Sequence, residues 1–224
     1  MSNDNVVKNN NKKCLITQDL VSALEWQENA PGSWKDKANE DLLNKLNRAP
    51  FDFASLADAA KIGIDMEKQI ARCARIHKVV GSEHMQKLIS MCIGGEFQKK
   101  LKKNVVIDGH ECFFYGKADV AFSDKLYDIK TTKKYNEDKY AESFQGLFYS
   151  YINKTTQFDY LVAELTKDST VESPEIKDLH IVESGFFGPE EVLEEIIFDK
   201  VRWAFERLKA QGLWEVYRDS YCLY

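Results

Sequence analysis

What the 224-residue sequence lacks excludes several kinds of protein. No apolar run approaches the roughly 20 residues that a membrane-spanning helix needs, so we expect no part of the chain in a membrane. The first 13 residues are polar, rich in Asn and Lys, and lack the apolar stretch of a secretory signal. We therefore predict a disordered polar tail over residues 1–13 and a cytoplasmic location.

Patterns for zinc binding and for disulfide bonding are absent too. The five cysteines are an odd number and contain no Cys-x-x-Cys pair, so neither a zinc knuckle nor a disulfide framework is expected. The four histidines are scattered along the chain. Reduced and mostly buried thiols are the better interpretation. The cysteines are Cys14, Cys73, Cys92, Cys112 and Cys222.

Charge is unevenly distributed. The net charge of −5 argues against a protein that coats nucleic acid, but the segment 98–139 holds ten Lys against seven Asp or Glu. A basic segment within an acidic chain is compatible with local phosphate binding. Charge alone would still favour an ordinary solvated hairpin.

Apolar residues at helical spacing fill the first half of the chain. Thr17 is placed to cap a first helix, and Ser82 to cap a helix that stops at Gly94-Gly95. Between them we expect a short helix and a longer helical stretch over residues 55–79. The expected core residues of the four helices are Leu20, Val21 and Leu24, then Leu42, Leu43 and Leu46, then Leu56, Ala59, Ala60, Ile64 and Ile70, then Met85, Leu88, Ile89 and Cys92.

After Gly95 the sequence pattern changes from helix-like to strand-like. Asp108-Gly109 is a strong hairpin signal between two expected strands. Further on we expect a polar, mobile loop over 166–178 and a long terminal helix opened by Pro189. The expected strands are 97–107, 112–122, 126–131, 158–165 and 179–184. A helix carrying Tyr140, Phe144, Leu147, Phe148 and Tyr151 should precede the fourth strand, and Val192, Ile196, Ile197, Val201 and Phe205 should face the core from the terminal helix.

This order of elements predicts a mixed α/β fold in which a sheet is flanked by helices. The sequence contains no internal repeat and no clear interdomain linker. We therefore expect a single domain over residues 14–224.

The segment 115–134 carries the candidate chemistry. Asp128 and Lys130 are two residues apart, so on a strand they share a face. If Ser123 and Asp124 form a two-residue turn, Asp119 lies directly opposite Asp128, with the two Cβ atoms roughly 4.5–5.5 Å apart. A longer turn would shift this register.

Two carboxylates in that arrangement repel each other unless a cation lies between them. Oxygen ligands suit Mg²⁺ or Mn²⁺ rather than zinc, and Mg²⁺ keeps waters that can act as nucleophiles. Lys130 would position the water, help to deprotonate it, or stabilise negative charge on a phosphate. Taken alone, the Asp-x-Lys pair is a weak signal.

Together with its context, this segment resembles the PD-(D/E)XK nucleases, especially their RecB-like and phage-exonuclease branch. The first motif is similar to residues 63–67, with Glu67 following Gly63. The others are Gly116-Lys117-Ala118-Asp119, the run from Asp128 to Thr132, and a Gln-x-x-x-Tyr motif formed by Gln145 and Tyr149. Each part is short, but their order and spacing over residues 63–149 are fairly specific.

The resemblance implies a restriction-endonuclease-like fold, a central mixed sheet with helices on both sides. It implies that the metal is bound by Asp119, Asp128 and the backbone carbonyl of Ile129, with Glu67 completing the cluster. Glu96 is a rival for that last place, and a surface glutamate is an equal alternative for Glu67. It implies that Lys130 is catalytic and that Gln145 and Tyr149 support the site or contact phosphate. We expect the residues after Lys130 to bind nucleic acid, namely Thr131, Thr132, Lys133 and Lys134.

The function that follows is Mg²⁺-dependent hydrolysis of DNA by a small stand-alone enzyme of the phage type. Such an enzyme would act in recombination, repair or nucleic-acid turnover, in the host cytoplasm if a phage encodes it. The resemblance favours an exonuclease over an endonuclease. An iron–sulfur cluster, which one branch of the group holds with cysteines near the C-terminus, is not expected because only Cys222 lies late in the chain. A homo-oligomer is compatible with the resemblance, although no residue argues for one.

Two alternatives stay open at this point. The first is an inactive nuclease-fold module that binds nucleic acid or a protein partner, which would be expected to have lost an acid or the lysine. The second is a metal phosphoesterase that acts on small nucleotides.

Overall fold

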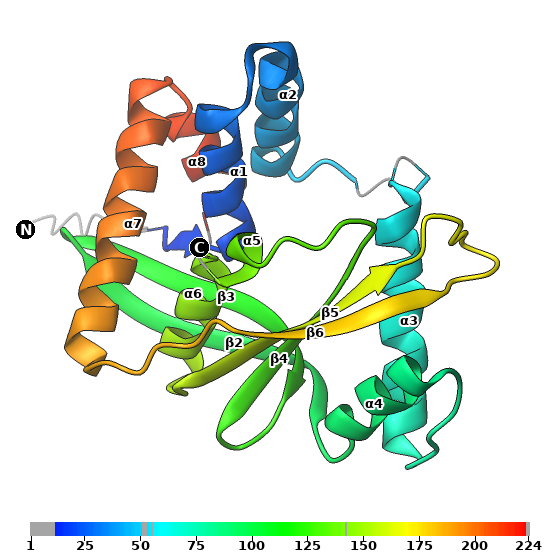
Figure 1. The fold of residues 1–224 in the computed structure, drawn as a ribbon. Coiled ribbons are helices and arrows are strands. Elements are labelled where there is room, and N and C mark those ends of the chain that lie inside the picture. The colour runs from blue at the N-terminus through cyan, green and yellow to red at the C-terminus, as the bar shows by residue number, and fades with distance from the viewer. Residues whose placement is uncertain (1–11, 51–52, 55, 142, 223–224) are drawn as a thin grey trace, which may run out of the picture. The chain divides into compact units, whose positions relative to one another are not determined.

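The computed structural model describes residues 12–50, 53–54, 56–141 and 143–222 (Figure 1). Residues 1–11 of the expected polar tail therefore lie outside the described residues. The helices are α1 (Gln18–Asn29), α2 (Lys35–Leu46), α3 (Asp58–Arg75), α4 (Glu83–Cys92), α5 (Asp138–Ala141), α6 (Phe144–Asn153), α7 (Glu190–Ala210) and α8 (Trp214–Ser220), with a 3-10 turn η1 (Gly32–Trp34). The strands are β1 (Cys14–Ile16), β2 (Glu96–Ile107), β3 (His110–Ala121), β4 (Lys125–Thr132), β5 (Gln157–Leu165) and β6 (Ile176–Glu183).

The six strands form one mixed sheet. Their order is β1-β3-β4-β5-β6, with β2 also paired to β3. β1 runs parallel to β3 and β4 parallel to β5, whereas the β3–β4 and β5–β6 pairs are antiparallel. The expected mixed α/β fold with a sheet flanked by helices is confirmed.

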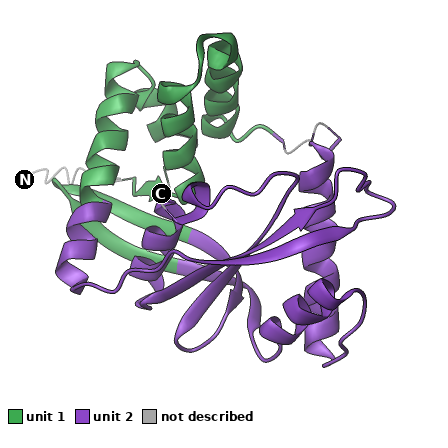
Figure 2. Cartoon of the chain, viewed as in Figure 1, with its two compact units in different colours: residues 1–49, 102–115, 198–224 green, residues 50–101, 116–197 purple. Residues whose placement is uncertain are grey.

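The chain divides into two compact units (Figure 2). Unit 1 comprises residues 1–49, 102–115 and 198–224, and unit 2 comprises residues 50–101 and 116–197. The single domain expected over residues 14–224 stays a prediction. Every residue of the expected nuclease motifs falls within unit 2.

Unit 2 has its core on one face of the sheet. α3 and α4 pack side by side over this face (Figure 1). They meet alternate residues of β4 and β5, because side chains alternate between the faces of a strand. The buried residues are Ile62, Met66, Ile70, Cys73 and Ala74 of α3, Met85, Leu88, Ile89 and Cys92 of α4, and Val120, Tyr127, Ile129, Leu161, Ala163, Leu165 and Leu179 of the sheet.

The intervening strand residues face α6. Ser143 caps this helix by accepting a hydrogen bond from the Gln145 backbone N–H at 3.3 Å. The Tyr149 ring meets Phe158 of β5 edge to face, with the ring centroids 5.9 Å apart. Helices therefore cover both faces of the sheet in unit 2, and the α6 face carries the candidate site.

Unit 1 shows the expected N-terminal helix. The Thr17 hydroxyl accepts a hydrogen bond from the Leu20 N–H at 3.2 Å, and Leu20, Val21 and Leu24 are buried. The Tyr217 hydroxyl of α8 donates to the Leu15 carbonyl of β1 at 3.0 Å. The prediction of reduced, buried thiols is confirmed, since all five cysteines of the chain are free and buried.

Several expected core residues were assigned to the wrong helix face. On α3 the buried stripe is Ile62, Met66 and Ile70, whereas Ile64 is only partly buried and Ala60 is exposed. α3 begins at Asp58 and ends at Arg75, so it is shorter than the expected range 55–79. Ser55, at the start of that range, lies outside the described residues. The exposed apolar residues that had been assigned to the core are Leu43 of α2 and Val192 and Ile196 of α7.

Other errors concern short elements. β1 and α8 were not expected, because three residues and seven residues are too short for a periodic signal. The helix expected around residues 140–151 is two helices, α5 and α6, because Ser143 starts a new one. Phe144 and Leu147, expected on its apolar side, are only partly buried. β6 begins at Ile176, three residues inside the loop expected over 166–178.

No helix in the described part of the chain combines the length and the apolar character needed to cross a bilayer.

Gly63 lets α3 approach β4 closely. A Cβ atom at this position would lie 2.6 Å from the Thr131 Oγ1 atom, which is too close. That hydroxyl cannot easily move away, because it donates a hydrogen bond to the Ala59 carbonyl at 2.6 Å. The contact fixes the position of α3 against β4, and with it the position of Glu67, which lies one turn further along α3.

We predict that Gly63→Ala destabilises the protein by about 1–3 kcal/mol, because the added methyl group overpacks this contact. Thr131→Ala should cost about 1 kcal/mol through its lost hydrogen bond. The double variant should cost less than the sum of the two, because removal of Oγ1 makes room for the methyl group. Denaturant unfolding of all four proteins measures this, and strict additivity would show that Gly63 and Thr131 do not constrain each other.

Candidate active site

The β3–β4 turn sets the register of the candidate site. Val120 pairs with Tyr127 and Ala121 with Leu126, and the Phe122 N–H donates to the Lys125 carbonyl at 2.9 Å across Ser123 and Asp124. The two-residue turn on which the expected register depends is therefore present. Beyond Val120 the two strands no longer pair as Cα partners. At this point a side chain takes the place of a backbone partner. The Asp119 Oδ2 atom accepts a hydrogen bond from the Ile129 backbone N–H at 2.8 Å.

Asp128 is buried beside this opening, with 2% of its surface exposed. Its Oδ1 accepts a hydrogen bond from the Gln145 side-chain amide of α6 at 2.6 Å. Its Oδ2 lies 2.5 Å from the Lys130 Nζ atom in an ion pair. Apart from Lys130, no donor in the described part of the chain reaches this oxygen. The lysine side chain is itself 39% exposed, so it links the buried acid to solvent.

Gln98 of β2 links a third acidic residue, Glu67, to Asp119 and Asp128. Its side-chain amide donates to the Asp119 Oδ1 at 3.2 Å and also to the Glu67 carboxylate of α3. Gln98 has a φ of 58°, inside a strand, which is an unusual conformation for a residue other than glycine. The sequence reasoning missed Gln98, because glutamine in a lysine-rich strand gives no signal by itself.

Glu67, rather than Glu96, stands at the cluster. Glu67 is partly buried and hydrogen-bonded to Gln98, as described above. Glu96 is exposed and takes no part in this network among the residues that the structure describes. The structure thus brings together Glu67, Asp119, Asp128 and Lys130, with Gln98 and Gln145 as amide links.

Burial, together with the crowding of like charges, sets the electrostatics of the site. Burial, followed by the neighbouring charges of Asp128 and Glu67, raises the pKa of Asp119 well above its usual value. Burial also raises the pKa of Glu67, and Asp128 adds to this effect. Burial alone would lower the pKa of Lys130, but the carboxylates of Asp128 and Asp119 outweigh it and raise that pKa. The lysine is consequently a stable cation in the site.

Gln145 and Tyr149 support the site from α6. The second side-chain atom of Gln145, Oε1, accepts a hydrogen bond from the Tyr160 hydroxyl at 3.2 Å. The Tyr149 hydroxyl accepts from the Lys117 backbone N–H at 3.3 Å. Its ring lies against Gly116, where a Cβ atom would come within 2.5 Å of the ring carbon Cε1. α6 therefore holds two parts of the site in place. Gln145 positions Asp128, and Tyr149 positions the Gly116–Asp119 segment of β3.

The residues expected to bind nucleic acid divide into two groups. The Thr131 hydroxyl is held by the Ala59 carbonyl, and the Thr132 hydroxyl donates to the Lys134 carbonyl at 2.9 Å. Both hydroxyl groups therefore serve the local fold. Lys133 and Lys134 are exposed. Their expected role in binding nucleic acid stays a prediction.

The donor set fits a hard divalent cation. Asp119 and Asp128 supply carboxylate oxygens that repel each other, and the charge that offsets them here comes from Lys130. Among the described residues, no group of three or more His, Cys, Asp or Glu side chains is already arranged to hold a metal ion. Mg²⁺ does not require one, because it usually keeps several waters and uses one or two protein carboxylates.

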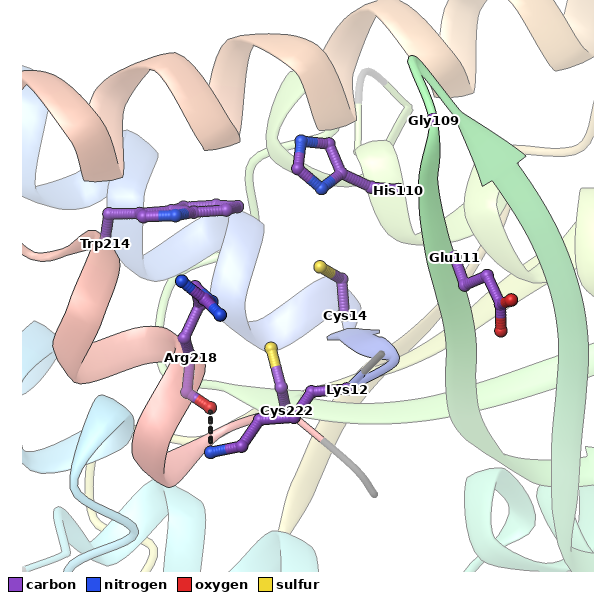
Figure 3. Close-up of a pocket in the computed structure, with 8 residues that line it drawn as sticks. All are labelled: Lys12, Cys14, Gly109, His110, Glu111, Trp214, Arg218 and Cys222. Atoms are coloured by element: carbon purple, nitrogen blue, oxygen red, sulfur yellow. Dashed lines mark hydrogen bonds between the residues drawn. The ribbon is translucent and has the colours of Figure 1, made fainter. Parts of the chain in front are cut away.

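A separate cavity lies within unit 1 (Figure 3). Its volume is about 200 Å³, and its lining residues include Cys14, Cys222 and Arg218. Hydrogen bonding with the Cys112 thiol, together with burial, raises the pKa of Cys14 to about 11. A neutral thiol of this kind is a poor nucleophile. The cavity contains none of the expected site residues.

Comparison with known proteins identifies the fold but no sequence family. No family model matches the chain, and no curated protein matches its sequence. The fold is similar to the crystal structure of an alkaline exonuclease, LHK-Exo, from Laribacter hongkongensis, at 11% identity and a TM-score of 0.50, covering 89% of this chain and 90% of that chain. It is also similar to the crystal structure of SSO0001, at 12% identity and a TM-score of 0.49, covering 86% of this chain and 77% of that one. The chain therefore shares the overall mixed α/β fold of that exonuclease structure.

We predict that Gln145→Leu lowers the free energy of unfolding by about 1–3 kcal/mol, because it leaves the buried Asp128 carboxylate without its amide donor. Gln69→Leu is the matched control on exposed α3 surface and should change stability by less than about 0.5 kcal/mol. Chemical denaturation compares the two. Equal, small effects would mean that Gln145 does not support Asp128.

Proposed function

We propose that this protein is a metal-dependent nuclease of the PD-(D/E)XK type that hydrolyses phosphodiester bonds in DNA. The observation that carries the proposal is the convergence of Asp119, Asp128 and Glu67 with Lys130 at the point where β3 and β4 separate. The likeness of the fold to an alkaline exonuclease supports it. Acidic side chains clustered without function would cost stability through their repulsion.

Asp119, Asp128 and the backbone carbonyl of Ile129 would hold Mg²⁺ or Mn²⁺, with Glu67 reached directly or through water. When bound, the cation supplies charge neutralisation and a water of lowered pKa. Gln98 and Gln145 orient the carboxylates, because each donates an amide hydrogen bond to one of them. Tyr149 keeps the Asp119 strand in place through Lys117.

Lys130 acts through its charge. Its raised pKa keeps it protonated near neutral pH, so it is unsuited to remove a proton from water. A cation at this place stabilises the negative charge that develops on a phosphate during attack. Of the three roles considered from the sequence, the raised pKa disfavours removal of a proton, and we propose charge stabilisation as the main role.

We propose an exonuclease rather than an endonuclease because the sequence resembles the phage-exonuclease branch. The similar fold of the alkaline exonuclease LHK-Exo supports this choice. DNA is the proposed partner. The inactive-module alternative is less favoured because all the acids and the lysine are present and brought together.

We predict that purified protein degrades linear DNA with Mg²⁺ or Mn²⁺ and not in excess chelator. Ca²⁺ should bind but support little turnover, because its longer bonds and looser geometry misplace the water. The assay compares linear and closed circular DNA, each single- and double-stranded, with a mononucleotide as a further substrate.

Any other result of this assay would contradict one specific part of the proposal. Undiminished cleavage in chelator would exclude the metal, and cleavage of closed circles would exclude a strict exonuclease. Phosphate release from the mononucleotide alone would favour the phosphoesterase. Binding without any cleavage would favour the inactive module.

We predict that Lys130→Ala lowers turnover about a hundredfold to a thousandfold with nearly unchanged affinity for DNA, because it removes charge stabilisation from the chemical step. Lys133→Ala is the control, since it removes an exposed charge three residues after Lys130. It should weaken binding slightly, and more at low salt, without changing single-turnover cleavage at saturating protein. Wild-type cleavage rates in Lys130→Ala would show that the lysine is not part of the catalytic site.

A further inference from the structure

A groove of about 510 Å³ lies beside the acidic cluster. It is bounded on one side by α3 and on the other by β2 and β3, and all of its lining residues lie in unit 2. Two of its lining residues, Glu67 and Gln98, also belong to the site network. The remaining residues that matter here are the cations Lys68, Arg72, Arg75 and Lys117.

Most of this positive charge has no counter-ion. Lys68 pairs with Asp65 at 2.9 Å. Arg72, Arg75 and Lys117 are exposed, and within the described residues none of them forms an ion pair with a carboxylate. Three cations that form no ion pair among the described residues thus surround one groove, in a chain with a net charge of −5. They create a local positive potential that attracts anions.

The cations are arranged along a line. Residues three and four apart lie on the same face of a helix, so Lys68, Arg72 and Arg75 form a row on α3. At a rise of 1.5 Å per residue the row extends about 10 Å. The Arg75 guanidinium lies over the Phe97 ring of β2, 5.4 Å from its centroid, which restrains it at the groove wall. A row of this length suits successive phosphates of one strand better than a single small anion.

The groove also leads to the reactive groups. Lys117 lines the same groove as Glu67, which belongs to the carboxylate cluster. Lys117 precedes Asp119 by two residues on β3. A strand whose phosphates follow the α3 row would therefore pass directly to the carboxylate cluster.

We propose that this groove binds the sugar–phosphate backbone of one strand of the substrate, with Arg72, Arg75 and Lys117 contacting phosphates next to the bond to be cut. The proposal rests on the proposed nuclease function for the identity of the strand. It assigns the main nucleic-acid contacts to α3 and β3, in addition to the Lys133 and Lys134 segment expected from the sequence.

The test is the salt dependence of DNA binding, measured by fluorescence anisotropy in chelator, so that no cleavage takes place. The probes are one labelled oligonucleotide as a single strand and the same sequence as a duplex. In Arg72→Ala/Arg75→Ala, the slope of log affinity against log salt should become shallower by about 0.7 per lost contact on the single strand, or about 0.9 on the duplex.

Two controls accompany the double variant. Lys87→Ala removes one exposed charge from α4, outside the groove, and should leave the slope unchanged. Arg72→Lys/Arg75→Lys keeps both charges and should retain the wild-type slope. Thermal melting of every variant confirms that the fold is kept.

A shallower slope on either probe, absent from both controls, supports the groove. An unchanged slope on both probes, an equal effect in Lys87→Ala, or no DNA binding by the wild type overturns it. The two proposals fail separately. Cleavage by a wild type whose groove variants bind normally would leave the nuclease function standing and remove the groove. Binding that depends on the groove, by a protein that never cleaves DNA, would support the groove and remove the nuclease function.

Discussion

The site depends on one electrostatic constraint, which is the placing of three carboxylates close together, where burial and neighbouring negative charge oppose the ionisation of Asp119 and Glu67. Asp128 is almost fully buried, and the pKa of Asp119 is raised by burial and by its acidic neighbours. The protein offsets this cost with fixed donors, namely the amides of Gln98 and Gln145, the Ile129 N–H and the Lys130 ammonium group. These donors come from β2, β4 and α6, so the constraint ties the three elements together.

The remaining structure of unit 2 can be understood as the support for those donors. Gly63 and Gly116 are close-approach positions, one setting α3 against β4 and the other admitting the Tyr149 ring beside β3. Both glycines lie in the segments in which nuclease motifs were predicted from the sequence. Their role here is geometric, since a side chain at either would displace a neighbour that positions an acid or its donor.

The sequence predicted best where the physical signal is local. The caps at Thr17 and Ser82 and the two-residue turn at Ser123-Asp124 follow from side-chain chemistry within a few residues, and all are present. Helix faces were less predictable. Ile64 and Ile196 are apolar but lie off the buried stripes, because the packing partner of a helix, and not its composition, decides which stripe is buried. Gln98 and the cations of α3 could not be found at all, since their significance comes from residues distant in sequence.

The central claim is that this carboxylate cluster is a divalent-cation site, and metal binding tests it without reference to activity. Mn²⁺ binding, followed by electron paramagnetic resonance or calorimetry, should be measured for the wild type, Asp119→Asn and Glu96→Gln. The account predicts that the wild type and Glu96→Gln bind Mn²⁺ alike and that Asp119→Asn loses most of this affinity. Equal Mn²⁺ binding by Asp119→Asn and the wild type, or no binding by the wild type, would contradict it.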